Sequence, residues 1–283
     1  MLNDLEKKTP SVPVTPVPAA TVMVLRDTPG GIEVLMVQRT KKADFAGGAL
    51  LFPGGKVDED DHHLLASKLC DLSEPIENEL RALRIAGARE IFEEAGLLFA
   101  RDPESRQLID DVRAQVINGK YRQKLLNKEL TFSQIISDEG LMVATDLLVP
   151  FAHLINTITG KKRFDTHFLI AKALKNHEAS HDGSETLDTI WIRPKTAIED
   201  AKAGKRRVVF PTRMNLKKVD ESPDVQTAIN VAKNTPVVTV LPEVSEVDGG
   251  RHLKIPIEAG YGISEITVDY AASDQPPPQN KSG

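Results

Sequence analysis

Short apolar runs separated by turn-forming residues mark the first part of the chain. Two β-branched runs, residues 20–25 (ATVMVL) and 32–38 (IEVLMVQ), flank the turn sequence DTPGG. This arrangement predicts a β-hairpin. A third run, residues 49–52 (ALLF), stops at a Pro-Gly-Gly sequence and predicts another short strand.

A long helical pattern follows. It runs from about Pro75 to Ala95, with Ser73 as the expected N-cap and Gly96 just after the C-terminus. Gly87 lies inside this stretch, where glycine costs about 1 kcal/mol relative to alanine. Its presence indicates that another part of the molecule packs closely against the helix backbone there.

A second helical pattern covers residues 103–139, which are rich in charge. Ile109, Val112 and Val116 recur at helical spacing, so we expect them to form the buried face of this region.

Strand patterns return in the second half of the chain. The runs that predict strands are residues 141–155, 163–174, 186–192, 236–244 and 252–262. A further helix is expected to start at Pro223, with Ser222 as its cap. The order strands, helix, strands, helix favours a mixed α/β or α+β domain over regular βαβ alternation.

Composition places the chain among ordinary globular proteins. It has 283 residues, of which 40% are hydrophobic and 27% charged, and a net charge of −5, which argues against a general nucleic-acid binder. Residues 1–18 and 271–283 are polar and proline-rich and are expected to be flexible tails around a single domain at 19–270. The chain has one cysteine, Cys70, and shows neither a signal-peptide pattern nor a long apolar run. We therefore expect a cytoplasmic protein without membrane contact.

The sequence REIFEEAG at residues 89–96 contains three glutamates at positions i, i+3 and i+4 of the first predicted helix. Like charges at this spacing cost a few tenths of a kcal/mol each. Glu90 and Glu94 are one helical turn apart and Glu93 flanks them, so the three carboxylates can converge on one cation. A divalent metal site would explain why they are placed together.

This stretch resembles the second half of the Nudix box, the signature of the Nudix hydrolases. The first half of that box, a glycine followed by five residues and a glutamate, is matched by Gly55 and by Asp61 in place of the glutamate. The family has seven residues between the halves, whereas this chain has 27, residues 62–88. An insertion at about residues 62–82 therefore interrupts the box, and we expect it to be helical.

The resemblance implies a Nudix-type α/β/α sandwich with a mixed sheet, and hydrolysis of a pyrophosphate linkage with Mg²⁺ or Mn²⁺. It also implies that Arg89 orients carboxylates. The metal ligands it implies are Glu90, Glu93, Glu94 and the backbone carbonyl of Gly55. Such chemistry needs mainly neutralisation of phosphate charge, which a cation held by oxygen ligands provides.

The catalytic base of this family often comes from a later loop. Glu185, six residues before Trp191, matches the family pattern and is the first candidate, with His181 as a second. His62 and His63, in the insertion, are further candidates for metal binding, although adjacent side chains point in different directions.

The substrate is suggested by a motif that precedes the box in the coenzyme A-hydrolysing branch of the family. Arg39 and Gly48 keep the spacing of that motif before Gly54 and Gly55, and these four are the expected substrate-binding residues. Two motif positions differ, with Val37 in place of threonine and Asp44 in place of arginine. The interrupted box and later segments also resemble a branch that includes peroxisomal acyl-coenzyme A diphosphatase and bacterial relatives.

The leading hypothesis is hydrolysis of coenzyme A or acyl-coenzyme A, a small-molecule diphosphate. ADP-ribose, a dinucleotide or a nucleotide sugar is the alternative substrate, and a Nudix-fold binding module without catalysis is the alternative class. Basic runs at residues 161–163 and 205–207 are candidates for phosphate contact. The oligomeric state stays open, with a homodimer as one option.

Overall fold

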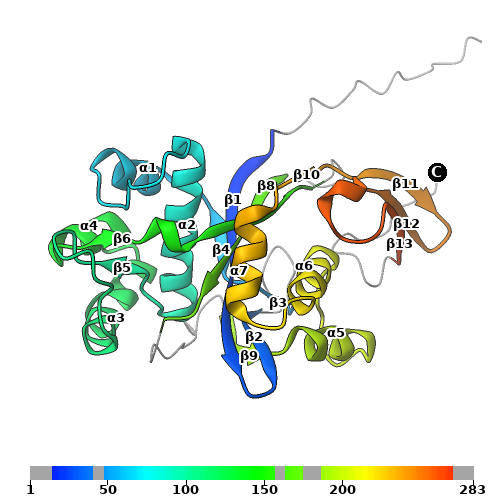
Figure 1. Ribbon diagram of the computed structural model, residues 1–283, viewed down its shortest axis with the longest axis horizontal. Coiled ribbons are helices and arrows are strands. Elements are labelled where there is room, and N and C mark those ends of the chain that lie inside the picture. The colour runs from blue at the N-terminus through cyan, green and yellow to red at the C-terminus, as the bar shows by residue number, and fades with distance from the viewer. Residues whose placement is uncertain (1–14, 41–47, 157–162, 175–185, 270–283) are drawn as a thin grey trace, which may run out of the picture.

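The computed structural model describes residues 15–40, 48–156, 163–174 and 186–269 (Figure 1). Its strands are β1 (Val17–Thr28), β2 (Gly31–Arg39), β3 (Leu50–Leu51), β4 (Gly54–Lys56), β5 (Ala100–Arg101), β6 (Met142–Val143), β7 (Val149–Ile155), β8 (Phe164–Lys172), β9 (Thr186–Ile192), β10 (Thr239–Val240), β11 (Glu243–Val247), β12 (Gly250–Lys254) and β13 (Glu265–Asp269). Its helices are α1 (Glu59–Ala66), α2 (Asn78–Ala95), α3 (Asp111–Leu126), α4 (Phe132–Asp138), α5 (Pro194–Lys202), α6 (Phe210–Asp220), α7 (Val225–Asn234) and the 3-10 turns η1 (Thr145–Leu147) and η2 (Ile257–Ala259).

The central sheet is mixed. Strands β10, β7, β8, β1, β2 and β3 follow one another across it, while β4 pairs with β1 and β9 pairs with β2. The predicted hairpin is confirmed, because β1 and β2 pair antiparallel with Leu25 opposite Val34. The other edge of β1 pairs parallel with β8. The N-terminal part of β1 also pairs with β4. Strand β1 begins at Val17, inside the stretch that the sequence assigned to the N-terminal tail.

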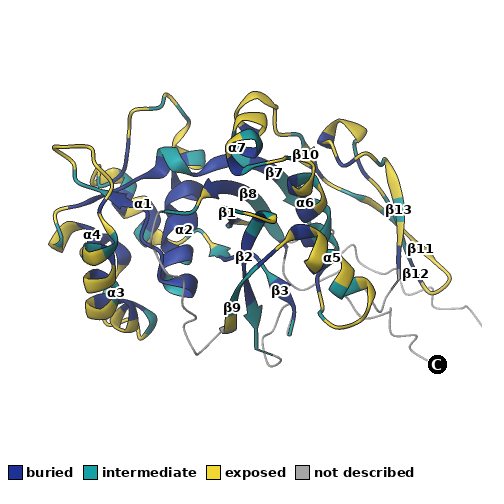
Figure 2. Ribbon diagram, turned by 60° about the horizontal axis from the view of Figure 1, so that its bottom comes forward, coloured by how far each residue is buried: buried dark blue, intermediate teal, exposed yellow. Residues whose placement is uncertain are grey.

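Helices cover both faces of this sheet. Along β1, Val22 and Val24 belong to the hydrophobic cluster that contains α2, whereas Met23 and Leu25 belong to the cluster that contains α5, α6 and α7. This alternation follows from the two-residue period of a strand. Buried residues accordingly concentrate in the central strands and in α2 (Figure 2). The predicted α/β/α sandwich with a mixed sheet is confirmed.

Helix α2 crosses the sheet at close range. A Cβ on Gly87 would lie 2.9 Å from Val22 Cγ2, which agrees with the close packing predicted at this glycine. Gly96 ends the helix with φ 71°, as expected. The predicted N-terminus is wrong, because the helix starts after Glu77, and Ser73 instead donates its backbone N–H to Asp71 Oδ1 at 2.8 Å.

The insertion in the box is helical at both ends, in the last part of α1 and at the start of α2, but not between them. Asp58 caps α1, which ends at Ala66, and the chain then runs without regular structure to α2. Leu64 is fully buried, whereas Leu72 is 43% exposed. The loop is anchored by Arg81, whose guanidinium donates to the carbonyl of Asp71 at 2.6 Å. The prediction of a helical insertion is therefore confirmed only for its two ends.

The region at 103–139 contains α3 and α4, but of the three residues predicted to be buried only Ile109 is buried. Val112 and Val116 are 67% and 63% exposed. The side chain of Asp110 caps the helix by accepting from Arg113 N at 2.8 Å, and Ile109 precedes the cap. With the helix starting there, the buried residues are Ala114, Ile117, Tyr121, Arg122 and Leu125.

The C-terminal part differs from expectation in three ways. Asp224, not Ser222, caps α7, because its Oδ1 accepts from Thr227 N at 2.7 Å. Helices α5 and α6 were not predicted. Strands β11, β12 and β13 form a separate antiparallel sheet rather than one final pair.

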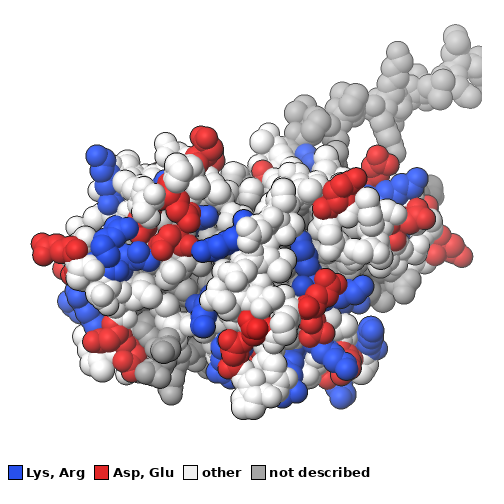
Figure 3. Space-filling view, in the orientation of Figure 1, with Lys and Arg blue, Asp and Glu red and all other residues white. Residues whose placement is uncertain are grey.

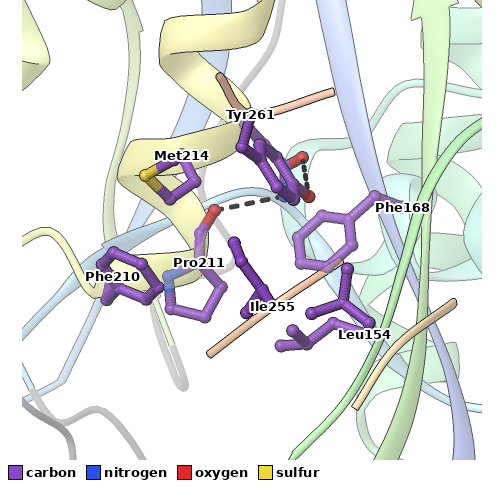
Figure 4. A pocket seen from close by; sticks show the side chains of 9 residues that line it. Leu154, Phe168, Phe210, Pro211, Met214, Ile255 and Tyr261 are labelled. Carbon is purple, nitrogen blue, oxygen red and sulfur yellow. Dashed lines mark hydrogen bonds between the residues drawn. The ribbon is translucent and has the colours of Figure 1, made fainter. Parts of the chain in front are cut away.

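A small apolar pocket lies where the C-terminal segment meets α6 (Figure 4). Ile255 and Tyr261 pack there with Leu154 and Met214. The hydroxyl of Tyr261 donates to Asn215 Oδ1 at 3.0 Å, which fixes the aromatic ring against α6. No helix in the described part of the chain is long and apolar enough to cross a membrane.

Candidate active site

The C-terminal half of α2 lies against the strand that carries the two glycines of the box. A Cβ on Gly55 would come within 2.1 Å of Glu90 Oε1, so only glycine leaves room for this carboxylate. The backbone N–H of Gly54 donates to Glu94 Oε2 at 3.0 Å. A side chain on residue 54 would also meet Ala20 O at 2.5 Å. The Gly-Gly pair therefore lets β4 approach both the helix and β1.

Arg89 gathers the acidic residues of the site. Its Nη1 donates to Glu90 Oε1 at 2.8 Å and to Glu93 Oε1 at 3.1 Å. Its Nε and Nη2 donate to the two oxygens of Asp61 at 2.9 and 3.0 Å, and Nη2 also donates to Lys56 O at 2.8 Å. The side chain of Arg89 is only 6% exposed. One buried guanidinium thus binds three carboxylates and both halves of the interrupted box.

Burial dominates the protonation of these carboxyl groups. It raises the pKa of Glu90 to about 7, with Arg89 opposing the rise and Glu93 adding to it. Burial also raises the pKa values of Glu93 and Asp61, again against the attraction of Arg89. Burial alone would lower the pKa of Arg89, but Glu90 and Asp61 raise it above its ordinary value. Three carboxylates, those of Asp61, Glu90 and Glu93, share the guanidinium of Arg89, an arrangement that a bound cation would stabilise.

The three helix glutamates do not form one compact group in this structure. Glu90 and Glu93 share Arg89, whereas Glu94 faces Gly54. Among the residues that the structure describes, the group with ligand atoms all within 4.8 Å of one another is instead His153, Asp165 and His167. Binding of a metal by the glutamates remains a prediction.

The other predicted residues lie in several places. Arg39 ends β2 and donates its backbone N–H to Ala49 O at 3.0 Å, and the N–H of Gly48 donates to Thr40 O at 3.2 Å. The ends of the segment between them are therefore held close together. Glu185 and His181 lie outside the described residues, as do Lys161 and Lys162 of the first basic run.

The structure also describes the two histidines of the insertion, the cysteine and the second basic run. His62 and His63 are exposed on α1. Cys70 is buried, and burial raises the pKa of its thiol to about 11, which suits an unreactive core residue. In the second basic run, Lys205 and Arg206 lie 3.6 and 3.4 Å from the carboxylate of Asp200. Basic and acidic side chains are interspersed on the face shown in Figure 3.

Two features of the site were not foreseen. The ion pair between Asp61 and Arg89 joins residues 28 positions apart and depends on the path of the chain between them. His153, Asp165 and His167 come together through strand pairing, and the only hint in the sequence is the Asp-Thr-His spacing of a strand.

Comparisons with known proteins identify the class. The chain is 26% identical to a Nudix hydrolase from Alicyclobacillus acidocaldarius, whose crystal structure superposes with a TM-score of 0.62 over 78% of this chain and 99% of that one. It is also 27% identical over 197 residues to putative nudix hydrolase 7 of Caenorhabditis elegans, a match covering 68% of this chain. No protein-family model matches the chain. The chain has the Nudix fold and is a homologue of the Nudix hydrolases.

A more particular likeness is to acyl-coenzyme A diphosphatase NUDT19. The protein of that name from Xenopus laevis is 26% identical over 212 residues, which cover 61% of this chain. The chain spans 57% of the length of the Caenorhabditis elegans relative and 56% of that of the Xenopus laevis relative.

Proposed function

We propose that the chain is a divalent-metal-dependent hydrolase that cleaves the pyrophosphate linkage of a nucleoside diphosphate joined to another group. The observation that carries this proposal is that Arg89 aligns Glu90 and Glu93, with Glu90 opposite the side-chain-free backbone of Gly55.

The residues present fit Mg²⁺ or Mn²⁺. Glu90, Glu93 and Glu94 offer carboxylate oxygens and Gly55 offers a carbonyl, which are the ligands these ions prefer. The space above Gly55, which a Cβ would fill, keeps the backbone within reach of Glu90. The cation would supply charge neutralisation at the phosphate oxygens and activation of water.

The protein's own residues have separate roles in this proposal. Arg89 holds the carboxylates of Glu90 and Glu93 in a fixed orientation and is itself held by Asp61. A cation bound by Glu90 would displace the proton that burial favours on its carboxyl group, because a carboxylate binds a metal in its charged form. Glu185 is proposed as the base, from its position in the sequence alone.

Within this class we infer coenzyme A or acyl-coenzyme A as the first substrate to test. The names of the NUDT19 relatives support this inference, as does the spacing of Arg39 and Gly48 before the glycines of the box. ADP-ribose, dinucleotides and nucleotide sugars are the competing substrates. A binding module without turnover is the competing class.

The test is a turnover panel with the full chain and millimolar Mg²⁺ or Mn²⁺. Coenzyme A, an acyl-coenzyme A, ADP-ribose, a dinucleotide and a nucleotide sugar are each followed by chromatography. The expected result is fastest turnover of a coenzyme A compound, with 3′,5′-ADP as a product. Faster hydrolysis of another compound would overturn the substrate inference but keep the class.

Two variants on the same helix test the site itself. Glu93→Gln keeps the side-chain shape and should reduce turnover by about a hundredfold or more, because it removes a charge at the metal site. Glu79→Gln, at the exposed start of α2, should retain the parent rate. Equal rates in both variants, or no turnover of any compound by the parent, would refute the proposed hydrolase.

A further inference from the structure

A second group of metal-ligating side chains lies on strands β7 and β8 of the central sheet. His153 on β7 is the direct cross-strand neighbour of His167 on β8, and Asp165 precedes His167 by two residues on the same strand. Residues two apart on a strand point to the same face, so all three side chains project together. Each offers one ligand atom, and these atoms all lie within 4.8 Å of one another. We call this group the His-Asp-His cluster.

Hydrogen bonds already orient the cluster. His153 Nε2 contacts Asp165 Oδ1, and His153 Nδ1 lies 2.8 Å from the hydroxyl of Thr239 on the adjacent β10. His167 Nε2 lies 3.7 Å from the same Asp165 oxygen. The carboxylate of Asp165 accepts from Nε2–H of His153, so in the uncharged ring Nδ1 accepts from the hydroxyl of Thr239. Binding of an ion through Nε2 would release that proton and let Nδ1–H donate to Thr239. A histidine fixed in this way by a second hydrogen bond is the usual arrangement at a metal site.

The cluster shares a sheet face with the candidate active site. His167 is in register with Ala20 on β1, and Ala20 is in register with Gly55 on β4. Paired residues point to the same face, and Gly55 faces Glu90 on that side. Two strand spacings separate His167 from Gly55, which is about 10 Å between backbones. Only the small side chain of Ala20 stands between them on the intervening strand.

We propose that His153, Asp165 and His167 form a second cation site, which binds a divalent transition metal, Zn²⁺ foremost, through two imidazoles and one carboxylate. Imidazole favours Zn²⁺ over Mg²⁺, whereas the all-oxygen glutamate site favours the reverse. This assignment does not depend on the proposed hydrolase activity.

The geometry requires only a small contraction. Ligand atoms around tetrahedral Zn²⁺, at about 2.0–2.1 Å from the ion, are about 3.3 Å apart. The present separations of up to 4.8 Å close to that value by side-chain rotation. The rings of His153 and His167 are stacked at 3.9 Å with an angle of 19°, so one ring turns to aim its lone pair at the ion.

Exposure leaves access for the ion and for a further ligand. The side chains of His153, Asp165 and His167 are 14%, 31% and 25% exposed.

The experiment uses the full chain without a histidine tag, freed of metal by chelation and titrated with Co²⁺ and Zn²⁺. Co²⁺ held by two imidazoles and a carboxylate in a four-coordinate site absorbs visible light much more strongly than Co²⁺ in an all-oxygen octahedral site. The expected result is a saturable visible band from one Co²⁺ per chain that Zn²⁺ displaces. Zn²⁺ at micromolar concentration should also raise the melting temperature.

Three variants test which residues bind the Co²⁺ that gives the visible band. His167→Asn should weaken Co²⁺ and Zn²⁺ binding at least tenfold. His252→Gln, which changes a histidine on β12 outside the cluster, should bind like the parent, and so should Glu93→Gln, which alters only the glutamate site. If His167→Asn does not fold, Asp165→Asn replaces it, because asparagine retains an oxygen that accepts from His153.

The outcomes separate the alternatives. A band that survives both His167→Asn and Asp165→Asn, or one that Glu93→Gln abolishes, would overturn the second site. Absence of any saturable band in the parent would leave the three residues as a hydrogen-bonded group without a metal. Loss of the band in His167→Asn with retention in the other two variants establishes the site, whatever the turnover panel shows.

Discussion

Replacing Glu90 by glutamine tests the electrostatic description of the active site. The change keeps the shape of the side chain and its contact with Arg89 but removes one negative charge. Burial is the main reason that the pKa of Glu90 rises from 4.5 to about 7, with Arg89 opposing and Glu93 reinforcing the rise. The charged form of Glu90 is therefore less favourable in the folded protein than in the unfolded chain.

The size of the effect follows from linkage. A pKa higher by about 2.5 corresponds to about 3 kcal/mol, at about 1.4 kcal/mol per pKa unit. Because Glu93 shares the same guanidinium, we expect Glu90 itself to contribute about 1 to 3 kcal/mol of this difference to the free energy of unfolding. The folded protein has this contribution to its free energy of unfolding in full below pH 4.5, where Glu90 is protonated in both the folded and the unfolded states. The contribution is lost as the pH rises through about 7.

The metal-free parent should therefore lose stability between pH 5 and pH 8 in part through Glu90. Glu90→Gln should lack this loss, so that it is more stable than the parent by about 1 to 3 kcal/mol at pH 8 and nearly equal to it at pH 5. Mg²⁺ should reverse the order, because it stabilises only the form that binds it, by about 2.7 kcal/mol at 100 times Kd.

The assay is urea unfolding at pH 5 and pH 8 with a chelator, repeated at pH 8 with Mg²⁺. Glu79→Gln, an exposed change on the same helix, is the matched control and should shift stability by less than about 0.5 kcal/mol at either pH. A Glu90→Gln protein that is less stable than the parent at pH 8 without metal would refute the reasoning. It would mean that the ion pair with Arg89 outweighs the cost of burial.

Two further predictions concern Gly55 and Asp71. Gly55→Ala places a Cβ 2.1 Å from the present position of Glu90 Oε1, so the carboxylate must move. Turnover should fall at least tenfold, while the melting temperature should change by only a few degrees. Turnover equal to that of the parent would show that Glu90 needs no space there. Asp71→Asn removes ion pairs to Arg101 and Arg106. Hydrogen bonds from Ser73 and the charge of Arg106 hold the pKa of the buried Asp71 at about 2 against the effect of burial. The substitution should lower the free energy of unfolding by about 2 kcal/mol at pH 7. Urea unfolding should show that the difference between variant and parent decreases only below pH 4, because the parent loses the contribution of ionised Asp71 as the pH falls through about 2.

The sequence predicted those parts of the fold that local signals determine. The hairpin follows from two β-branched runs around DTPGG, and Gly96 ends α2 because a left-handed residue there favours glycine. The exposed Val112 and Val116 show the limit of such reasoning. The choice of cap at Asp110 sets the rotation of the helix, and spacing between apolar residues alone left that rotation undetermined.

Helices α5 and α6 were missed because only part of what they bury is large and apolar. The buried residues of α5 are Pro194 and Ala197, and α6 buries Thr212 and Asn215 beside Leu216 and Val219. The same limit applies to the His-Asp-His cluster. The pairing of β7 with β8 brings His153 to His167, and the register between two strands cannot be obtained from the composition of either one.

The interrupted box shows how a site survives an insertion in its own signature. The chain leaves the site after Asp61, in the first turn of α1, and returns to it along α2. Asp61 accepts from Asp58 N at 3.0 Å as part of the capping box of α1 and, at 1% exposure, also accepts two hydrogen bonds from Arg89. The two halves of the signature are therefore joined by a buried ion pair rather than by their spacing along the chain. Extra residues after position 61 need only let α1 and α2 approach each other, and aspartate can replace the longer glutamate because α1 brings its backbone within reach of the guanidinium.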